Sequence, residues 1–135
     1  MILVDSNVLI DVVTRDPAWL EWSRAELNAA AASDELAIND VVYAELSVRY
    51  QRIDELDDFV ARSGLAIVTI PRAALFRAGK AFQRYRVAGG VRTGVLPDFF
   101  IGAHAAVTES RLITRDASRF RTYFPEVRLI APSLA

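Results

Sequence analysis

Four acidic residues are the side chains of this sequence best placed to do chemistry. Asp5 follows the apolar run MILV, and Glu45 lies in the segment DVVYAELSVRY, which has a helical pattern. Asp98 follows a glycine-rich loop, and Asp116 comes directly after LITR. The chain has one histidine, one lysine and no cysteine. Few other side chains therefore offer acid–base or nucleophilic chemistry.

A cluster of four carboxylates needs a compensating positive charge. Two like unit charges about 4 Å apart repel by about 4 kcal/mol at an effective dielectric constant of 20. A hard divalent cation removes this cost, and ligation by oxygen alone suits Mg²⁺ or Mn²⁺. Because Mg²⁺ usually binds one or two carboxylates together with substrate phosphates, an acidic cluster beside a basic surface indicates hydrolysis of a phosphodiester.

Alternating strands and helices are expected to position these acids. Apolar runs predict strands over 2–5, 35–39, 65–70, 111–114 and 127–131. Amphipathic or capped segments predict helices over about 17–32, 40–50, 53–62, 71–86, 97–107 and 117–123, with Asn39 or Asp40 capping the second. Such alternation predicts an α/β fold with a parallel sheet covered on both faces. The length predicts a single domain over residues 1–135.

This architecture predicts where the acids meet. In open α/β sheets, ligands bind beyond the carboxyl ends of the strands, where the strand order reverses. Asp5 and Asp116 follow expected strands, Glu45 lies in the helix after the second strand, and Asp98 begins a later helix. We therefore expect all four side chains at one edge of the sheet.

Each acid also has a purely structural explanation. Asp98 could be a first-turn acid favoured by the helix dipole. Glu45 could pair with Arg49 on the same helical face. Asp116 could cap the helix that follows it, and Asp5 could anchor a turn. The convergence of all four on one expected edge favours a common site.

The charge of the chain is unevenly distributed. Residues 1–60 hold 13 acids and 4 bases, whereas residues 61–135 hold 4 acids and 12 bases. No acid lies between Asp58 and Asp98. This asymmetry indicates a polyanionic or acidic ligand, although a solvated helix face explains the basic residues equally well.

The composition also predicts a location. The absence of cysteine suits a reducing compartment. The amino terminus lacks the basic and apolar regions of a signal peptide, and no apolar segment reaches the roughly 20 residues that span a bilayer. We expect a cytoplasmic protein without a membrane partner.

Four segments carry a resemblance to a known family. VDSNVLID, INDVVYAELS, LPDFFIGAHAAV and LITRDASRF, in this order and spacing, resemble the PIN-domain ribonucleases, particularly the VapC toxins. The resemblance covers essentially the whole chain. It implies a five-stranded parallel sheet flanked by helices, RNA cleavage dependent on Mg²⁺ or Mn²⁺, and a cognate VapB antitoxin. It also implies a homodimer, for which helices near Trp19–Leu27 and Val42–Val48 are candidate surfaces.

The resemblance assigns roles to individual residues. The implied acidic quartet is Asp5, Glu45, Asp98 and Asp116. Asp5, Asp98 and Asp116 would bind metal, and Glu45 would hold metal-bound waters or help to deprotonate the nucleophile. The residues at positions typical of supporting polar side chains are Ser6, Asn7 and Thr114. The implied reaction is in-line attack of metal-activated water on an RNA phosphodiester.

Several side chains outside the quartet also carry predictions. Arg84, Arg86 and Arg92 flank the glycine-rich loop and are candidate RNA contacts. His104 lies six residues after Asp98, about 240° around a helix, so it should point away from the acids and be structural. We expect Trp19 and Trp22, one turn apart, to belong to the core or an interface rather than to a base-stacking platform.

Other functions remain open. A phosphotransferase of the haloacid-dehalogenase type would need a second acid where Asn7 stands and a usable lysine, for which Lys80 is the sole candidate. A phospho-receiver domain would need a paired acid beside Asp5 and a lysine after a late strand, and the sequence has neither. A non-catalytic RNA- or protein-binding module would use the basic residues and treat the acids as caps and salt bridges.

Overall fold

The computed structural model describes residues 1–92 and 94–133 and contains one five-stranded sheet. The strands are β1 (Ile2–Val4), β2 (Leu36–Asn39), β3 (Ala66–Val68), β4 (Arg111–Ile113) and β5 (Leu129–Ile130). They lie in the order β3-β2-β1-β4-β5, and every neighbouring pair is parallel. The predicted α/β fold with a five-stranded parallel sheet is confirmed.

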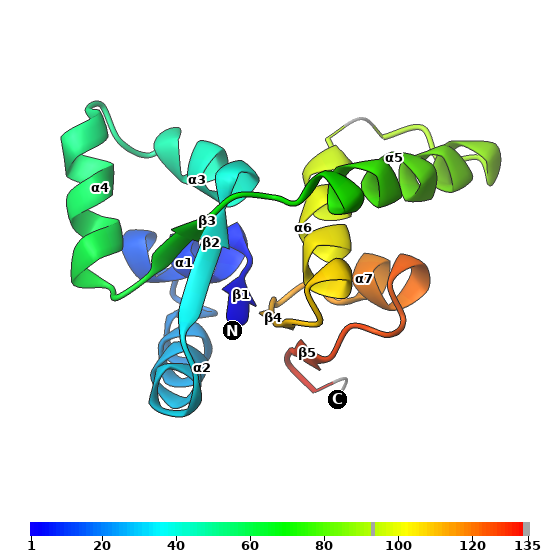
Figure 1. Ribbon diagram of the computed structural model, residues 1–135. Helices are drawn as coiled ribbons and strands as arrows, with labels where there is room; N and C mark the ends of the chain where they lie inside the picture. The colour runs from blue at the N-terminus through cyan, green and yellow to red at the C-terminus, as the bar shows by residue number, and fades with distance from the viewer. Residues whose placement is uncertain (93, 134–135) are drawn as a thin grey trace.

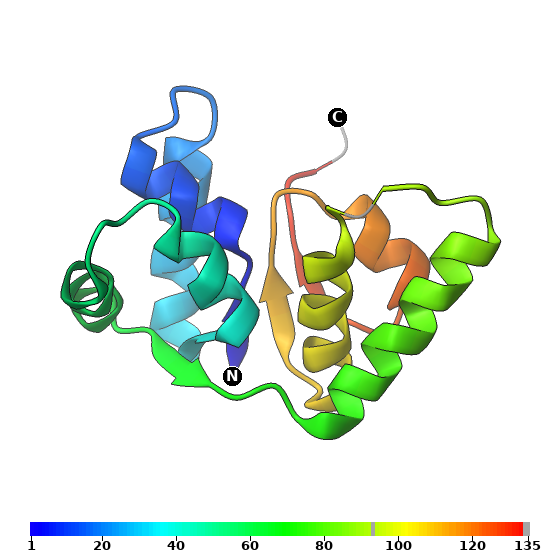
Figure 2. The same ribbon diagram turned by 90° about the horizontal axis from the view of Figure 1, so that it is seen from above.

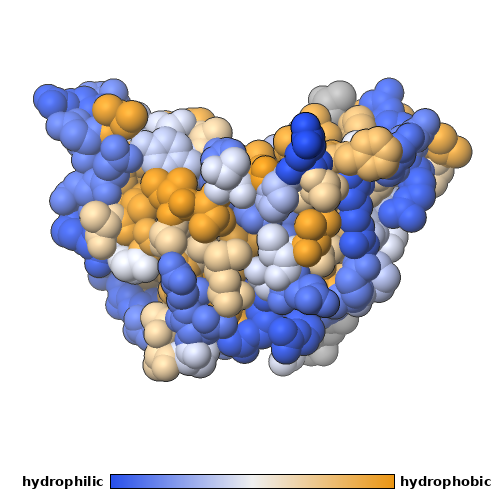
Figure 3. Space-filling view, viewed as in Figure 1, coloured by the Kyte–Doolittle hydropathy of each residue, from blue (hydrophilic) through white to orange (hydrophobic). Residues whose placement is uncertain are grey.

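Helices flank this sheet on both sides. They are α1 (Ser6–Thr14), α2 (Leu20–Ser33), α3 (Asp40–Ser47), α4 (Ile53–Arg62), α5 (Arg72–Val87), α6 (Leu96–Val107) and α7 (Ser118–Tyr123). Helices α1–α4 gather on one side of the molecule and α5–α7 on the other (Figures 1 and 2). The space-filling view is notched between these two groups (Figure 3).

The order of the strands places a crevice at the centre of the sheet. The chain moves outwards from β1 to β2 and β3, and then returns so that β4 pairs with the other side of β1. The strand order therefore reverses between β1 and β4. Ligands of open α/β sheets bind at such a point, beyond the carboxyl ends of the strands.

Local sequence explains most of the elements. Helix α4 has the bounds predicted for it, and the Asn39 side chain caps α3 by accepting hydrogen bonds from the backbone N–H groups of Val41 and Val42. Helix α2 begins at Leu20 rather than near Pro17, because the Asp16 carboxylate accepts hydrogen bonds in a turn that precedes it. Helix α1 was not predicted.

The core lies on both faces of the sheet. The strands β1 and β2 are buried along their whole length, which explains their apolar sequences. Helix α6 is buried on most of its surface because α5, α7 and α3 pack around it. In the described part of the chain, no helix has the length and apolar character required to cross a membrane.

Candidate active site

Asp5 lies at the carboxyl end of β1, where the strand order reverses. Its backbone N–H donates to the Ile113 carbonyl at 2.9 Å, and its carboxylate accepts a 2.8 Å hydrogen bond from the Thr114 hydroxyl. Only 4% of Asp5 is exposed. The pKa of Asp5 rises from 3.8 to about 7, mainly through burial; the charges of Asp98 and Glu45 also raise it, whereas the hydrogen bond from Thr114 lowers it.

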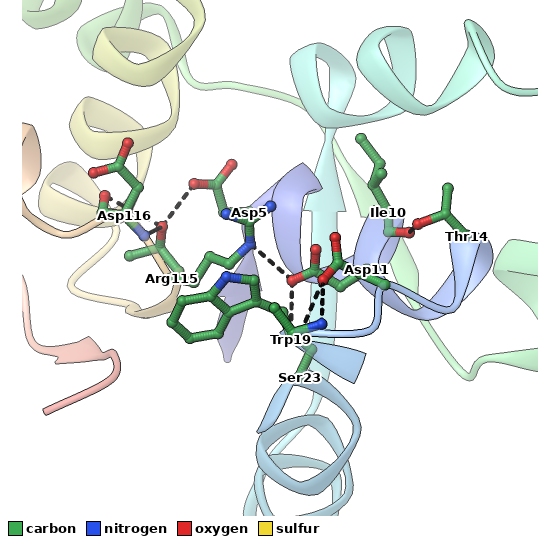
Figure 4. Close-up of polar contacts among 11 residues, drawn as sticks. Asp5, Ile10, Asp11, Thr14, Trp19, Ser23, Arg115 and Asp116 are labelled. Atoms are coloured by element: carbon green, nitrogen blue, oxygen red, sulfur yellow. Dashed lines mark hydrogen bonds and ion pairs between the residues drawn. The ribbon is translucent and has the colours of Figure 1, made fainter. Parts of the chain in front are cut away.

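Thr114 and Asp116 follow β4, the strand beside β1. The backbone N–H of Asp116 donates to the Thr114 hydroxyl at 3.1 Å, so one threonine joins Asp5 to the turn that carries Asp116 (Figure 4). The Asp116 side chain is exposed and makes no capping bond to α7. Its position is therefore not explained by helix capping.

Glu45 reaches the same region from α3. It is half-buried, and its carboxylate accepts a 3.0 Å hydrogen bond from the Ser6 hydroxyl. Within the described part of the chain it forms no salt bridge with Arg49. Burial raises the pKa of Glu45, Ser6 lowers it, and Asp98 raises it further.

Asp98 lies in the first turn of α6 and faces the start of α7. Its carboxylate accepts a 2.5 Å hydrogen bond from Nη1 of Arg119, and both side chains are largely buried. Burial raises the pKa of Asp98, the Arg119 guanidinium opposes this increase, and Asp116 adds to it. Asp98 thus interacts electrostatically with each of the other three acids.

The predicted supporting residues all lie beside these acids. Ser6 holds Glu45, and Thr114 holds Asp5. Oδ1 of Asn7 is buried and has no hydrogen-bond partner among the described residues. A buried amide oxygen that accepts no hydrogen bond carries a free-energy cost. A bound cation or a water molecule would remove this cost by contacting the Asn7 oxygen.

The oxygen atoms of the four acids are ligands of the kind that a divalent cation prefers. Their carboxylates are not close enough together to surround one ion. No three Asp, Glu or His side chains among residues 1–92 and 94–133 are grouped closely enough to hold one ion. All the available donors are oxygens, and the buried carboxylates repel one another. Arg119 supplies the positive charge beside Asp98.

The predicted RNA-binding arginines lie at the end of α5 and in the loop that follows it. Arg84 and Arg86 are exposed in the last turn of α5. Arg92 is exposed in the loop that follows, where its backbone N–H donates to the Tyr85 hydroxyl at 3.2 Å. They stand on the segment that leads into α6 and Asp98.

The remaining predictions concern His104 and the two tryptophans. His104 is buried, and its Nδ1 lies 3.2 Å from Nδ2 of Asn39, the residue that caps α3. Burial lowers the pKa of His104. A structural role is thus supported. Trp19 and Trp22 pack edge to face, both half-buried.

Sequence reasoning missed three residues that the structure places near the site. Arg119 contacts Asp98, and Arg115 donates from Nε to the carboxylate of Asp11 at 2.8 Å. The available signal was weak: both arginines flank Asp116 in the segment TRDASR. Asp11 is buried within α1, and a buried acid in an apolar helix indicates a partner.

Residues 2–124 match the PIN domain family. The chain belongs to this family. Its PIN domain also has the fold of several solved structures. A chain of Rickettsia felis VapBC2 bound to promoter DNA superposes with a TM-score of 0.74 at 20% identity, covering 98% of this chain and 100% of that one. A chain of a Klebsiella pneumoniae toxin–antitoxin complex gives a TM-score of 0.71 at 23% identity, covering 98% of both chains.

A third structure extends this similarity. A chain of FitAcB from Neisseria gonorrhoeae superposes on this PIN domain with a TM-score of 0.68 at 18% identity, covering 96% of both chains. At these identities the similarity shows a shared fold. No curated protein matches this sequence significantly.

Proposed function

We propose that this PIN domain is a metal-dependent endoribonuclease that acts as the toxin of a toxin–antitoxin pair. The observation that carries the proposal is the position of Asp98. Its charge raises the pKa values of Asp5 on β1 and Glu45 on α3, and the charge of Asp116 after β4 raises the pKa of Asp98, which supports one shared site. Helix capping and surface ion pairs do not account for this arrangement.

The proposed metal ligands are Asp5, Asp98 and Asp116, with Glu45 beside them. Bound Mg²⁺ or Mn²⁺ would neutralise the carboxylates, polarise the phosphate and acidify water. Thr114 and Ser6 would keep the Asp5 and Glu45 carboxylates in fixed orientations through their hydrogen bonds. Oδ1 of Asn7 would offer a further oxygen at the same edge.

The sequence and structure give less support to a phosphotransferase function, the alternative raised by the sequence. Asn7 stands where that chemistry needs an acid. The ammonium group of Lys80 lies 5.3 Å from the centre of the Phe76 ring, on α5, rather than beside Asp5. A non-catalytic binding module also explains poorly why carboxylates are buried together, because isolated buried charges are costly.

Cleavage of RNA by the purified protein tests the enzymatic part. Wild-type protein with Mg²⁺ or Mn²⁺ should cut single-stranded RNA, and EDTA should abolish cleavage. Asp98→Asn should remove activity, whereas Asp54→Asn, an exposed acid on α4, should not. Equal cleavage by wild type and Asp98→Asn would refute the proposed site.

Thermal melts test metal binding without relying on activity. A ligand that binds only the folded state stabilises by about 2.7 kcal/mol at one hundred times Kd. Wild type should gain such stability from Mg²⁺ or Mn²⁺. Asp98→Asn should lose most of this gain while remaining folded without metal, because it removes one charge from a repelling cluster. An equal shift in both proteins would exclude Asp98 as a ligand.

The proposed partners are RNA and a VapB-type antitoxin. Structures with this fold come from complexes described as VapBC or toxin–antitoxin, which supports the second partner. Expression of this chain alone should arrest growth, and co-expression of a small partner from an adjacent gene should relieve the arrest. Growth equal to that of Asp5→Ala at matched expression would contradict a toxin role.

Arg84, Arg86 and Arg92 remain the proposed contacts to the RNA backbone along α5. Their exposure and their position before α6 support this role. Arg86→Gln and Arg92→Gln should weaken RNA binding and flatten its dependence on salt. An unchanged salt dependence would indicate a solvated face.

A further inference from the structure

A hollow of about 510 Å³ opens beside Asp116, and its lining includes none of Asp5, Glu45 and Asp98. Its lining includes Trp19 before α2, Arg115 and Asp116 from the turn after β4, Arg121 of α7, and Pro132 beyond β5. Two guanidinium groups thus border one concavity that shares Asp116 with the proposed metal site. The volume is in the range of pockets that hold small ligands.

Arg115 is held rigidly at the border of this hollow. Its Nε donates to the buried carboxylate of Asp11, which also accepts a 2.9 Å hydrogen bond from the Ser23 hydroxyl. Its guanidinium carbon lies 5.5 Å from the centre of the Trp19 ring. Figure 4 shows Arg115 reaching from beside Asp116 towards Asp11, with the Trp19 ring alongside.

The anchoring of Arg115 uses only part of its hydrogen-bonding capacity. Among the described residues, neither terminal nitrogen of its guanidinium has a hydrogen-bond partner, and about a third of its side chain is exposed (31%). A pre-oriented guanidinium loses less conformational entropy on binding than a mobile one. Planar paired N–H donors match a phosphate group. Arg121 is exposed on the same hollow and adds a second positive charge.

We propose that Arg115 and Arg121 form a subsite for a phosphate of the bound RNA strand, next to the phosphate that is cleaved. Asp11 and Trp19 are positioning residues that hold Arg115 in place. The subsite rests on the proposed nuclease function for its ligand, but its binding role is testable separately. The RNA strand would then contact the turn between β4 and α7 as well as Arg84, Arg86 and Arg92 at and after the end of α5.

Equilibrium binding of a labelled, random-sequence single-stranded RNA tests the subsite. Every protein in the series carries Asp98→Asn to prevent cleavage and is measured with Mg²⁺ by fluorescence anisotropy over a range of salt. Arg121→Gln should weaken binding by about threefold to tenfold. It should also lower the slope of log K against log salt by about 0.7, the value for one phosphate contact to a single strand.

A matched control and a charge-compensated variant separate binding from folding. Arg128→Gln removes an exposed arginine beside Glu126 and Val127, in a different hollow, and should change neither affinity nor slope. Arg115→Gln alone would leave the Asp11 carboxylate buried without its partner. The double variant Asp11→Asn/Arg115→Gln is therefore used instead. It should lower the slope of log K against log salt by about 0.7, the value for one phosphate contact. Asp11→Asn alone should weaken binding while keeping the slope, because Arg115 remains charged.

The outcomes distinguish the subsite from the nuclease proposal. In otherwise wild-type protein, Arg121→Gln should raise KM for RNA cleavage with little change in kcat. If wild type does not cleave RNA but Arg121→Gln still lowers the slope, the subsite stands and the nuclease function fails. If wild type cleaves RNA and Arg121→Gln behaves like Arg128→Gln in affinity and slope, the subsite is wrong. RNA binding that no member of the series alters would also refute it.

Discussion

The carboxyl group of Asp5 links the stability of the metal-free protein to pH. Its pKa of about 7 in the folded protein lies above the 3.8 of an ordinary aspartate. The stabilisation from its proton is therefore fully present below pH 3.8 and is lost as pH rises through 7. A shift of this size corresponds to about 4 kcal/mol.

Urea unfolding in EDTA at several pH values measures this effect. Wild type should lose stability between about pH 4 and pH 8. Asp5→Asn should lose less, because its amide does not titrate. The residual slope should combine losses from Glu45 and Asp98, whose pKa values are also raised, with an opposite contribution from buried His104, whose pKa is lowered. Identical pH dependence in the two proteins would show that Asp5 is not protonated in the folded state.

Arg119 acts as an internal counter-charge for Asp98. Without metal, Arg119→Gln should lower the free energy of unfolding by about 1–2 kcal/mol, because Asp98 then lacks its cationic partner in a largely buried position. With Mg²⁺ the loss should shrink, and calorimetric titration should show tighter metal binding because the guanidinium no longer competes. Arg62→Gln, which breaks an exposed pair with Asp58, provides the control and should leave metal affinity unchanged.

Single residues were only partly predictable from the sequence. Asp5, Glu45, Asp98 and Asp116 were predicted as one group because each was expected to lie at the same edge of a parallel sheet, after a strand or in the helix that follows a strand or loop. The Arg115–Asp11 pair could not, because its members are 104 positions apart and each is ordinary in its own segment. Contacts of this kind depend on which strands become neighbours.

At the scale of elements, the packing of α6 on α7 sets the distance between Asp98 and Arg119. Gly102 of α6 permits this packing, since a Cβ atom there would lie 2.4 Å from Cδ2 of the Phe124 ring. Gly102→Ala should destabilise by about 1–3 kcal/mol despite the better helix propensity of alanine. Gly79→Ala in α5, where a Cβ atom meets nothing within 4 Å, should instead stabilise by up to about 1 kcal/mol.

Thermal melts of the two alanine variants compare these expectations directly. Because Phe124 and Phe120 would have to move, Gly102→Ala should also shift Arg119 relative to Asp98 and weaken the response to Mg²⁺. Equal stability of the two variants would show that Phe120 and Phe124 can move to accommodate the Cβ atom at position 102 without lowering the free energy of unfolding.

The elements themselves followed closely from local sequence, with one exception. Helix α4 has a strong amphipathic pattern, with Leu56 and Val60 buried, and its bounds were predicted. Helix α1 was missed because its sequence SNVLIDVVT is short and rich in β-branched residues, which favour strands. Tertiary packing against α2 and α3 overrides that preference.

For the whole molecule, we expect a homodimer in solution. The candidate surfaces named from the sequence are near Trp19–Leu27 and Val42–Val48, and Val48 at the end of the second is 84% exposed. Val48→Asp should therefore shift the protein towards monomer, whereas Val107→Asp, at the end of α6, should not. Light scattering at micromolar concentration measures the mass, and a monomeric wild type would refute the expectation.

The order of the strands lay beyond sequence reasoning. Alternating patterns predict parallel strands, but they do not specify that β4 lies beside β1. That pairing joins residues more than one hundred positions apart, Ile2 with Arg111 and Val4 with Ile113. It depends on the crossover through α5 and α6, whose direction is a property of the assembled fold.

The central pairing of β1 with β4 has a consequence for how the chain is made. A ribosome releases Asp5 and Glu45 early, but the strand that completes the crevice is formed by residues 111–113, and Asp116 follows it. A nascent chain therefore carries half of the acids and an open side of β1 for most of its synthesis. A protein proposed to cut RNA would thus lack its complete set of acids until residues 111–116 have left the ribosome.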